Sequence, residues 1–103
     1  MAVGMLLAGE LVTRDTYVQV TEKMFGNYPM RPDQSPDGLI LHTAGETPEG
    51  FYIYDVWESK EHFQRFNESQ VGPAMQEILG DAQPDGPTPE PQYYDVEVLV
   101  SPA

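Results

Sequence analysis

The chain has 103 residues, 40% of them apolar and 11% aromatic, which is enough for one hydrophobic core and too little for two. Seventeen acidic residues oppose five basic ones, and the resulting charge of -12 argues against nucleic acid and anionic membrane surfaces as partners. The absence of cysteine excludes disulfides, a thiolate nucleophile and a zinc–thiolate site. The apolar opening, Met1 to Gly9, lacks a basic leader and is too short to span a bilayer. We therefore expect one cytoplasmic domain over residues 1–103.

A short apolar run and a capping residue mark the first two elements. The run from Val3 to Val12 predicts a buried strand. Thr13 then suits the N-cap of a helix over about Arg14–Phe25, in which apolar residues recur at roughly helical spacing. The prolines that follow this helix predict a loop.

Two segments rich in aromatic and branched residues predict a β-hairpin. They are Gly38–Ala44 and Phe51–Trp57, and the turn between them, Gly45–Gly50, contains the glycines and the proline typical of such connections. This hairpin places two strands side by side near the middle of the chain.

A second helix and a last strand complete the pattern. Ser59 predicts the start of the helix, and Gly72 with Pro73 should kink it or restart it. The proline-rich stretch Asp81–Gln92 predicts an extended arm that leads to a strand over Tyr93–Val100. The element order is therefore β-α-β-β-α-β, the order of an α+β, ferredoxin-like fold with a four-stranded antiparallel sheet.

Two helices can cover only one face of such a sheet, and the other face also needs a cover. In Phe51–Trp57 the residues of both parities are apolar, whereas a solvated face would alternate with polar residues. The simplest cover is the same face of a second copy. We expect a homodimer through the open sheet face, and a monomeric mass at micromolar concentration would rule it out.

Three stretches, GLILHTAG, YDVWES and HFQRFNESQVGPAM, resemble the dimeric α+β barrel superfamily and its small antibiotic-biosynthesis monooxygenase-like members. The resemblance implies ferredoxin-like protomers whose sheets close into a barrel-like dimer, with a pocket between each sheet and its helices or in the lumen. The superfamily includes cofactor-free oxygenases of quinol-like polyketides, lactone isomerases, polyketide cyclases, haem-degrading enzymes and proteins without known activity.

We expect neither a cofactor nor a metal. The haem-degrading branch has an asparagine on strand one and a tryptophan and a histidine on helix two, whereas Phe66 stands at the tryptophan position here and no histidine follows His62. There is no GxGxxG motif, no P-loop and no basic cluster for a phosphate. His62 follows Glu58 and Glu61, but the spacing matches no recognised metal motif, and acidic residues are expected near a helix N-terminus.

His42 and Asp55 are the candidate catalytic residues. A hairpin closed by Gly45–Gly50 can place positions 42 and 53 opposite each other, which makes Asp55 a near neighbour of His42. The carboxylate could then orient the imidazole as a base for proton abstraction. The alternative, which the frequency of structural pairs favours, is that His42 makes a satisfied polar contact in the sheet and Asp55 caps a turn or binds a backbone amide. A one-residue slip would separate the two side chains.

The candidate substrate-binding residues are apolar or aromatic, and most share the expected face of His42. They are Ile40, Phe51, Ile53, Trp57 and Phe66. Aromatic walls are typical of small-molecule pockets, although the same residues, and Tyr52 and Tyr54, could simply be core.

Two functions from different classes follow. The first is a cofactor-independent monooxygenase, cyclase or isomerase that abstracts a proton from an aromatic, quinol-like or polyketide-like substrate. The alternative is a non-catalytic homodimer that binds a small apolar or aromatic ligand or serves as an accessory protein. The two differ in whether His42 faces an open cavity.

Overall fold

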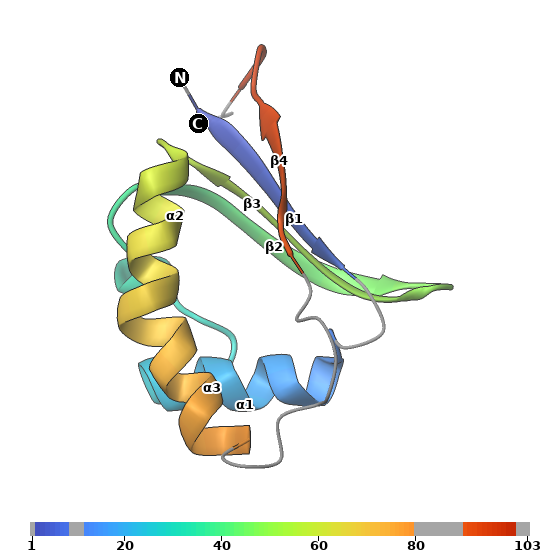
Figure 1. The fold of residues 1–103 in the computed structure, drawn as a ribbon, viewed down its shortest axis with the longest axis vertical. Helices are drawn as coiled ribbons and strands as arrows, with labels where there is room; N and C mark the ends of the chain where they lie inside the picture. Colours follow the sequence, from blue (N-terminus) through green and yellow to red (C-terminus); the bar gives the residue numbers. More distant parts are fainter. Residues whose placement is uncertain (1, 9–11, 80–89, 101–103) are drawn as a thin grey trace.

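The computed structural model of the protein describes residues 2–8, 12–79 and 90–100 (Figure 1). The strands are β1 (Val3–Ala8), β2 (Leu39–Thr47), β3 (Gly50–Trp57) and β4 (Gln92–Asp95). The helices are α1 (Arg14–Phe25), α2 (Lys60–Phe66) and α3 (Gly72–Leu79), with a 3-10 turn at Pro32–Gln34 and a π-helical segment at Asn67–Val71.

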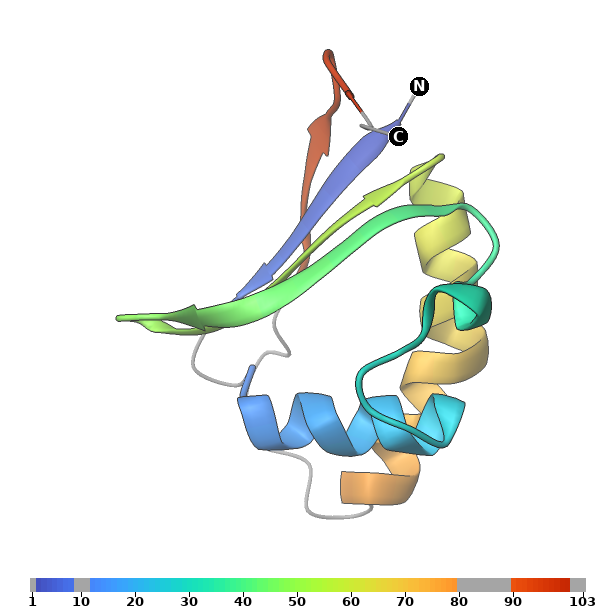
Figure 2. The ribbon, with the colours of Figure 1, turned by 180° about the vertical axis from the view of Figure 1, so that it is seen from behind.

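The four strands form one antiparallel sheet in the order β2-β3-β1-β4. Figures 1 and 2 show the helices on one side of this sheet, with α2 and α3 following each other and α1 crossing near the end of α3. The predicted α+β, ferredoxin-like order β-α-β-β-α-β is confirmed, with the second helix divided in two.

The predicted helix starts are confirmed by their caps. The Thr13 hydroxyl accepts a hydrogen bond from the Thr16 N–H, and the Ser59 hydroxyl accepts one from the His62 N–H. At the end of α1, Gly26 adopts φ 81° and donates its N–H to the carbonyl of Glu22. A left-handed glycine of this kind is a common helix terminator.

The second helix changes geometry before the predicted kink. The π-helical segment begins at Asn67, five residues before Gly72, and the Gly72 N–H donates to the Asn67 carbonyl. Pro73 has no N–H to donate to the preceding turn, so the helix reaches it more easily through a widened turn. The expected arm Asp81–Gln92 lies almost entirely outside the described residues.

The last strand is shorter than predicted. It ends at Asp95 rather than Val100, and one more backbone hydrogen bond joins the Val96 N–H to the Ala2 carbonyl. Beyond that point the described part of β1 offers no further residue to pair with. Val98 and Val100 are accordingly 75% and 77% exposed. The first strand is described only to Ala8, so its expected end at Val12 lies outside the described residues.

The hairpin register was predicted wrongly by two residues. His42 lies opposite Asp55, and Ala44 lies opposite Ile53, because the turn is shorter than expected and Thr47 already pairs with Gly50. A shift of two leaves every side chain on its face, so His42 and Asp55 still lie together.

The prediction that Ile40 shares this face was also wrong. A β-bulge between Leu39 and Leu41 inserts one extra residue, and Leu39 rather than Ile40 pairs opposite Trp57. Ile40 is 40% exposed and lies outside the core. The bulge thus places Leu39 where Ile40 was expected, on the face of His42 and opposite Trp57.

The face toward the helices carries the core. Met5, Trp57 and Phe63 are buried at its centre, and the partly buried hydrophobic residues around them are Leu7, Leu39, Ile53, Phe66 and Tyr93. The ring centroids of Trp57 and Phe63 are 5.7 Å apart, and those of Trp57 and Phe66 are 5.6 Å apart. These contacts hold the start of α2 against β3.

The opposite face has no helix over it and carries no charged side chain at any described strand position. By the strand pairings, its larger residues are Leu6, Leu41, Tyr52, Tyr54, Val56 and Tyr94. Leu41 and Tyr94 are 46% and 48% exposed. Among the described residues, no helix is long and apolar enough to cross a membrane.

Candidate active site between the sheet and the helices

A chain of hydrogen bonds runs from the sheet to α1. The Nδ1 atom of His42 lies 2.6 Å from a carboxylate oxygen of Asp55, and Nε2 lies 2.5 Å from the Tyr17 hydroxyl. The other carboxylate oxygen of Asp55 accepts a hydrogen bond of 3.3 Å from the indole N–H of Trp57. The sheet pairing aligns His42 with Asp55, and the first turn of α1 brings Tyr17 over them.

The partners of the imidazole assign its protons. A carboxylate only accepts hydrogen bonds, so Asp55 requires a proton on Nδ1 of His42. The neutral ring then has a lone pair on Nε2, and the Tyr17 hydroxyl donates to it. Protons therefore point along the chain from Tyr17 through His42 toward Asp55.

The three residues of this hydrogen-bonded chain differ in burial. The side chain of Asp55 is 7% exposed and that of His42 is 26% exposed. Burial raises the pKa of Tyr17, and the negative charge of Asp55 acts in the same direction as a smaller cause. Tyr17 is therefore a protonated phenol at neutral pH and can serve as a donor.

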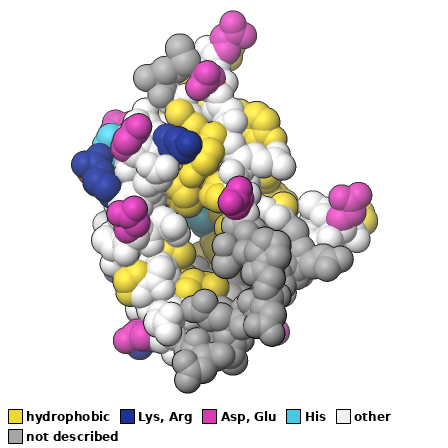
Figure 3. Space-filling model, viewed as in Figure 1, with side chains coloured by type: hydrophobic (Ala, Val, Ile, Leu, Met, Phe, Trp, Pro, Cys, Tyr) yellow, Lys and Arg dark blue, Asp and Glu magenta, His cyan; other side chains and the backbone are white. Residues whose placement is uncertain are grey.

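A mainly apolar cavity of about 110 Å³ adjoins the three residues. Figure 3 shows hydrophobic side chains gathered around a hollow between the sheet and the helices. Besides Tyr17, His42 and Asp55, it is lined by Met5, Leu7, Val20, Thr21, Met24, Phe25, Met30, Pro36, Leu39, Ile53, Trp57, Phe63, Phe66, Asn67 and Val71. A cavity of roughly 150 Å³ is known to admit benzene, so this smaller one takes about one aromatic ring at most, and a ligand of two or three rings would extend out of it.

Three of the five predicted binding residues line this cavity, namely Ile53, Trp57 and Phe66. Phe51 is buried on the same face, but it packs against the Tyr17 ring with centroids 5.3 Å apart and is not part of the lining. Ile40 is replaced by Leu39 through the bulge.

Sequence reasoning did not identify Tyr17 as a site residue. Its helical spacing with Val20, Thr21 and Met24 marks one face of α1, and all four residues line the cavity. That spacing shows which residues share a face. It does not show that a phenol meets a histidine 25 positions further along the chain.

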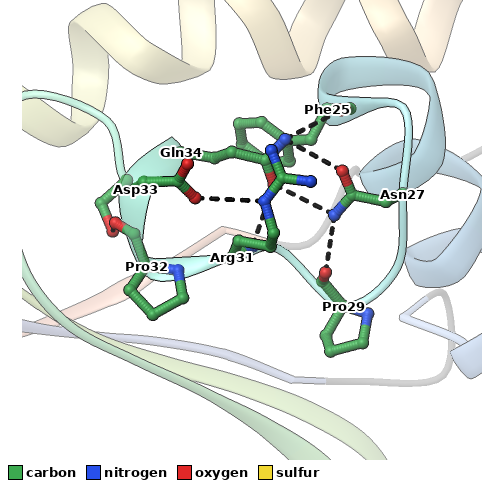
Figure 4. A network of polar contacts seen from close by, with 8 residues as sticks. Phe25, Asn27, Pro29, Arg31, Pro32, Asp33 and Gln34 are labelled. Atoms are coloured by element: carbon green, nitrogen blue, oxygen red, sulfur yellow. Dashed lines mark hydrogen bonds and ion pairs between the residues drawn. The ribbon is translucent and has the colours of Figure 1, made fainter.

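The loop between α1 and β2 supplies Met30 and Pro36 to the cavity wall. Figure 2 shows this loop from behind, and Figure 4 shows Asn27 and Gln34 pointing toward each other within it. The Gln34 amide accepts from Asn27 and from the Arg31 N–H, and it donates to Asn27 and to the Phe25 carbonyl, over 2.9 to 3.0 Å. One side chain thus fastens the loop to the end of α1.

The contacts of His62, the second histidine of the chain, indicate a structural role. Its Nδ1 atom lies 2.6 Å from the Ser59 hydroxyl, and its ring packs on Gly38, where an added Cβ would come within 2.4 Å of the ring. Gly38 has φ 87°, which favours glycine in any case. Within the residues the structure describes, no three histidine or acidic side chains are grouped to hold a metal ion.

No family model matches the chain, and no curated protein matches it. Solved structures do. A monooxygenase from the gene ActVA-Orf6 of Streptomyces coelicolor, in complex with Nanaomycin D, is 14% identical with a TM-score of 0.56 over 99% of this chain and 92% of that one. The protein NE2512 of unknown function from Nitrosomonas europaea is 12% identical with a TM-score of 0.57 over 99% and 93%.

A third similar structure is a candidate antibiotic biosynthesis monooxygenase from Nitrosomonas europaea. It is 14% identical with a TM-score of 0.54 over 95% of this chain and 100% of that one. At these identities the likeness concerns the fold and not the chemistry. The resemblance to the small antibiotic-biosynthesis monooxygenase-like proteins is thereby confirmed at the level of the ferredoxin-like fold.

Proposed function

We propose that the protein binds a small, neutral, aromatic or polyketide-like molecule in the cavity and abstracts a proton from it, with His42 as the base. The observation that carries the proposal is the hydrogen-bonded chain of Tyr17, His42 and Asp55 at the wall of an apolar cavity. A monooxygenase of the same fold, in complex with Nanaomycin D, gives it support by analogy.

The environment of His42 suits a general base. Asp55 accepts the Nδ1 proton, which leaves the Nε2 lone pair directed away from the sheet, and a carboxylate in this position stabilises the imidazolium that forms. The Trp57 indole fixes the second carboxylate oxygen. The base is therefore oriented before a substrate arrives.

The cavity favours a neutral substrate because no cation lines it. The five basic residues of the chain are Arg14, Lys23, Arg31, Lys60 and Arg65, and none belongs to the cavity lining. Lys23 pairs with Glu77, and Arg31 pairs with Asp33. A carboxylate or phosphate in the cavity would be desolvated beside Asp55 without a counter-charge.

Loss of the proton leaves an enolate or a phenolate as the common intermediate. Attack on an internal carbonyl would give cyclisation, reprotonation at another carbon would give isomerisation, and reaction with dioxygen would give oxygenation. The substrate decides among these outcomes, and the residues of the site serve the shared first step.

The test replaces His42 with Gln, which keeps a polar side chain of similar length. We expect the wild-type protein to turn over at least one member of a panel of neutral quinols, anthrones and lactones, and the His42→Gln variant to lose about 100-fold or more of this rate. An unchanged rate in a folded variant would remove His42 from the mechanism. Saturable binding without any turnover by the wild-type protein would favour the alternative, a non-catalytic ligand-binding protein.

We also propose that a second copy of the chain covers the open sheet face, as in a dimeric α+β barrel. The face combines exposed Leu41 and Tyr94 with an absence of charge at the described strand positions, although the whole chain carries -12. An uncharged apolar patch on such an acidic protein is typical of an interface. Two like faces around a twofold axis bury each other without any repulsive pair at their centre.

A further inference from the structure

We propose that Tyr17 is a catalytic residue that carries the proton between the substrate and His42. This inference rests on the function proposed above and refines it. His42 remains the final proton acceptor, and the Tyr17 hydroxyl is the group that touches the reacting atom.

Tyr17 blocks the direct access of a substrate to His42. Both nitrogens of the imidazole are already engaged, Nδ1 by Asp55 at 2.6 Å and Nε2 by the Tyr17 hydroxyl at 2.5 Å. A substrate can reach Nε2 directly only if the hydroxyl leaves. In this bond the Tyr17 hydroxyl donates its proton and uses none of its lone pairs, so the oxygen can still accept a proton, and Tyr17 itself lines the cavity.

The phenol ring of Tyr17 is held in a fixed position. Phe51 packs against it at a tilt, and Tyr28 contacts it edge-on with centroids 6.0 Å apart. The Thr21 hydroxyl also donates to the backbone carbonyl of Tyr17. A ring held by these contacts keeps its hydroxyl directed at His42, and Tyr17 belongs to the cavity lining, as a relay requires.

The proton transfers balance as follows. A C–H or O–H bond of the substrate breaks, and its electron pair stays on the substrate as an enolate or phenolate. The proton goes to the Tyr17 oxygen while the phenolic proton of Tyr17 passes to Nε2 of His42, and Asp55 stabilises the imidazolium. Concerted transfer avoids a free phenolate, which burial of Tyr17 would disfavour. Reversal of the same steps returns the proton to another atom of the substrate.

The test follows deuterium exchange into the C1 methylene of 2-tetralone, a neutral aromatic ketone whose enol resembles a naphthol. The rate is measured by proton NMR in deuterated buffer for the wild-type protein and for two matched variants. Tyr17→Phe removes the relay hydroxyl and keeps the ring. Tyr93→Phe removes a hydroxyl from a partly buried ring of the core that neither lines the cavity nor takes part in the hydrogen bonds from Tyr17 to Asp55.

We expect Tyr17→Phe to lower the exchange rate by about 100-fold or more and Tyr93→Phe to leave it within about twofold. A purely structural role for Tyr17 is tested by placing fluorinated tyrosines of increasing acidity at position 17. The rate should follow the acidity of the phenol if the proton passes through it. A rate that is indifferent to fluorination, or a Tyr17→Phe variant as fast as the wild type, would overturn the relay.

His42→Gln separates the failure of this inference from failure of the proposed function. Loss of exchange in His42→Gln together with full exchange in Tyr17→Phe would remove the relay and leave His42 as the base. Full exchange in both variants, or no exchange by the wild-type protein with 2-tetralone, would overturn both proposals. Circular dichroism establishes that each variant is folded, and where Tyr17→Phe does not fold, the fluorinated series decides.

Discussion

Asp55 shows how one buried carboxylate organises the site. Its side chain is only 7% exposed, and both of its oxygens accept hydrogen bonds, from His42 and from the Trp57 indole. Burial of a charge without such partners would be costly. The same contacts determine which nitrogen of His42 carries the proton, so Asp55 acts on the chemistry through the histidine as a positioning residue.

Replacement of Asp55 by Asn should invert this proton order. The shape is retained, but an amide group facing Nδ1 can donate a proton to it, which shifts the imidazole proton to Nε2. Nitrogen-15 NMR of the neutral imidazole should then report a proton on Nε2 in the variant and on Nδ1 in the wild-type protein. Loss of the charge-assisted hydrogen bond should also lower the free energy of unfolding by about 1–3 kcal/mol.

Asp33→Asn is the matched control, because Asp33 is exposed and its side chain pairs with Arg31, away from the cavity and from His42. It should change neither the His42 tautomer nor the urea unfolding midpoint. If Asp55→Asn left the proton on Nδ1, the assignment of proton directions along the chain would be wrong.

Tyr17 should make stability sensitive to alkaline pH. Burial raises the pKa of Tyr17, so the folded protein holds the phenolic proton more tightly than the unfolded chain does. This contribution is fully present below about pH 10, the ordinary value for tyrosine, and is lost as pH rises through the raised pKa.

Urea unfolding across this alkaline range, for the wild-type protein and Tyr17→Phe, measures the contribution. The unfolding midpoint of the wild-type protein should fall more steeply with pH. Burial also raises the pKa of Tyr93, so a smaller slope should remain in the variant. Equal slopes would show that Tyr17 titrates alike in both states.

The pairing of His42 with Asp55 could be predicted because it depends only on parity within a short hairpin. The two-residue error in register did not alter which face each residue occupies. Ile40 could not be placed correctly, since a single bulge between Leu39 and Leu41 reverses the parity locally and leaves no clear signal in the sequence. The contact of Tyr17 with His42 depends on how α1 lies over the sheet, which local pattern does not determine.

The loop between α1 and β2 is held in place by one side chain. Gln34 concentrates four hydrogen bonds that fasten this loop to the end of α1 (Figure 4). The loop in turn brings Met30 and Pro36 to the cavity. The cavity wall on this side therefore depends on polar contacts rather than on core packing.

Gln34→Ala should loosen the loop without unfolding the domain. Amide hydrogen exchange between residues 27 and 35 should accelerate at least about tenfold, while exchange within β3 stays unchanged, because local openings can be cheaper than global unfolding. Asp33→Ala is the control, since it removes only an exposed ion pair worth about 0–1 kcal/mol. Equal protection in both variants would contradict the role given to Gln34.

Capping residues made the helix starts predictable, whereas the interruptions of the helices were less so. Thr13 and Ser59 each act locally, and the structure uses both as expected. The π-helical segment at Asn67–Val71 arises from the joint demands of Pro73 and of packing on the cavity, so its start could not be located from sequence.

The net charge of the molecule opposes dimerisation, whereas the open sheet face favours it. Two copies that each carry -12 repel, while their uncharged sheet faces favour burial. Added salt should therefore strengthen dimerisation, because it screens the repulsion and hardly weakens apolar contacts.

Leu41→Glu places a charge on the open face and should give a monomer at micromolar concentration. Gln19→Glu adds the same charge to exposed α1 and should leave the dimer intact. Sedimentation velocity at low and high salt measures both effects. A wild-type protein that sediments as a monomer at every salt concentration would contradict the proposed dimer.

The order of elements was predictable because each strand and helix has its own local signal. The exact end of the last strand was not, since aromatic and branched residues continue past Asp95 and Glu97 to Val100, while the described part of the chain has no residue before Ala2 to pair with them. The cover of the open face involves a second molecule, so it stays a prediction from pattern and charge.

NMR of the His42 imidazole with added 2-naphthol tests most directly whether the cavity is a ligand site built around His42. 2-Naphthol is a stable mimic of the enol that the proposed base would generate. We expect saturable shifts of both ring nitrogens, together with the Tyr17 ring signals, and no comparable change at His62. An imidazole of His42 that responds no more than that of His62 at any concentration of 2-naphthol would show that the cavity is not a ligand site built around His42.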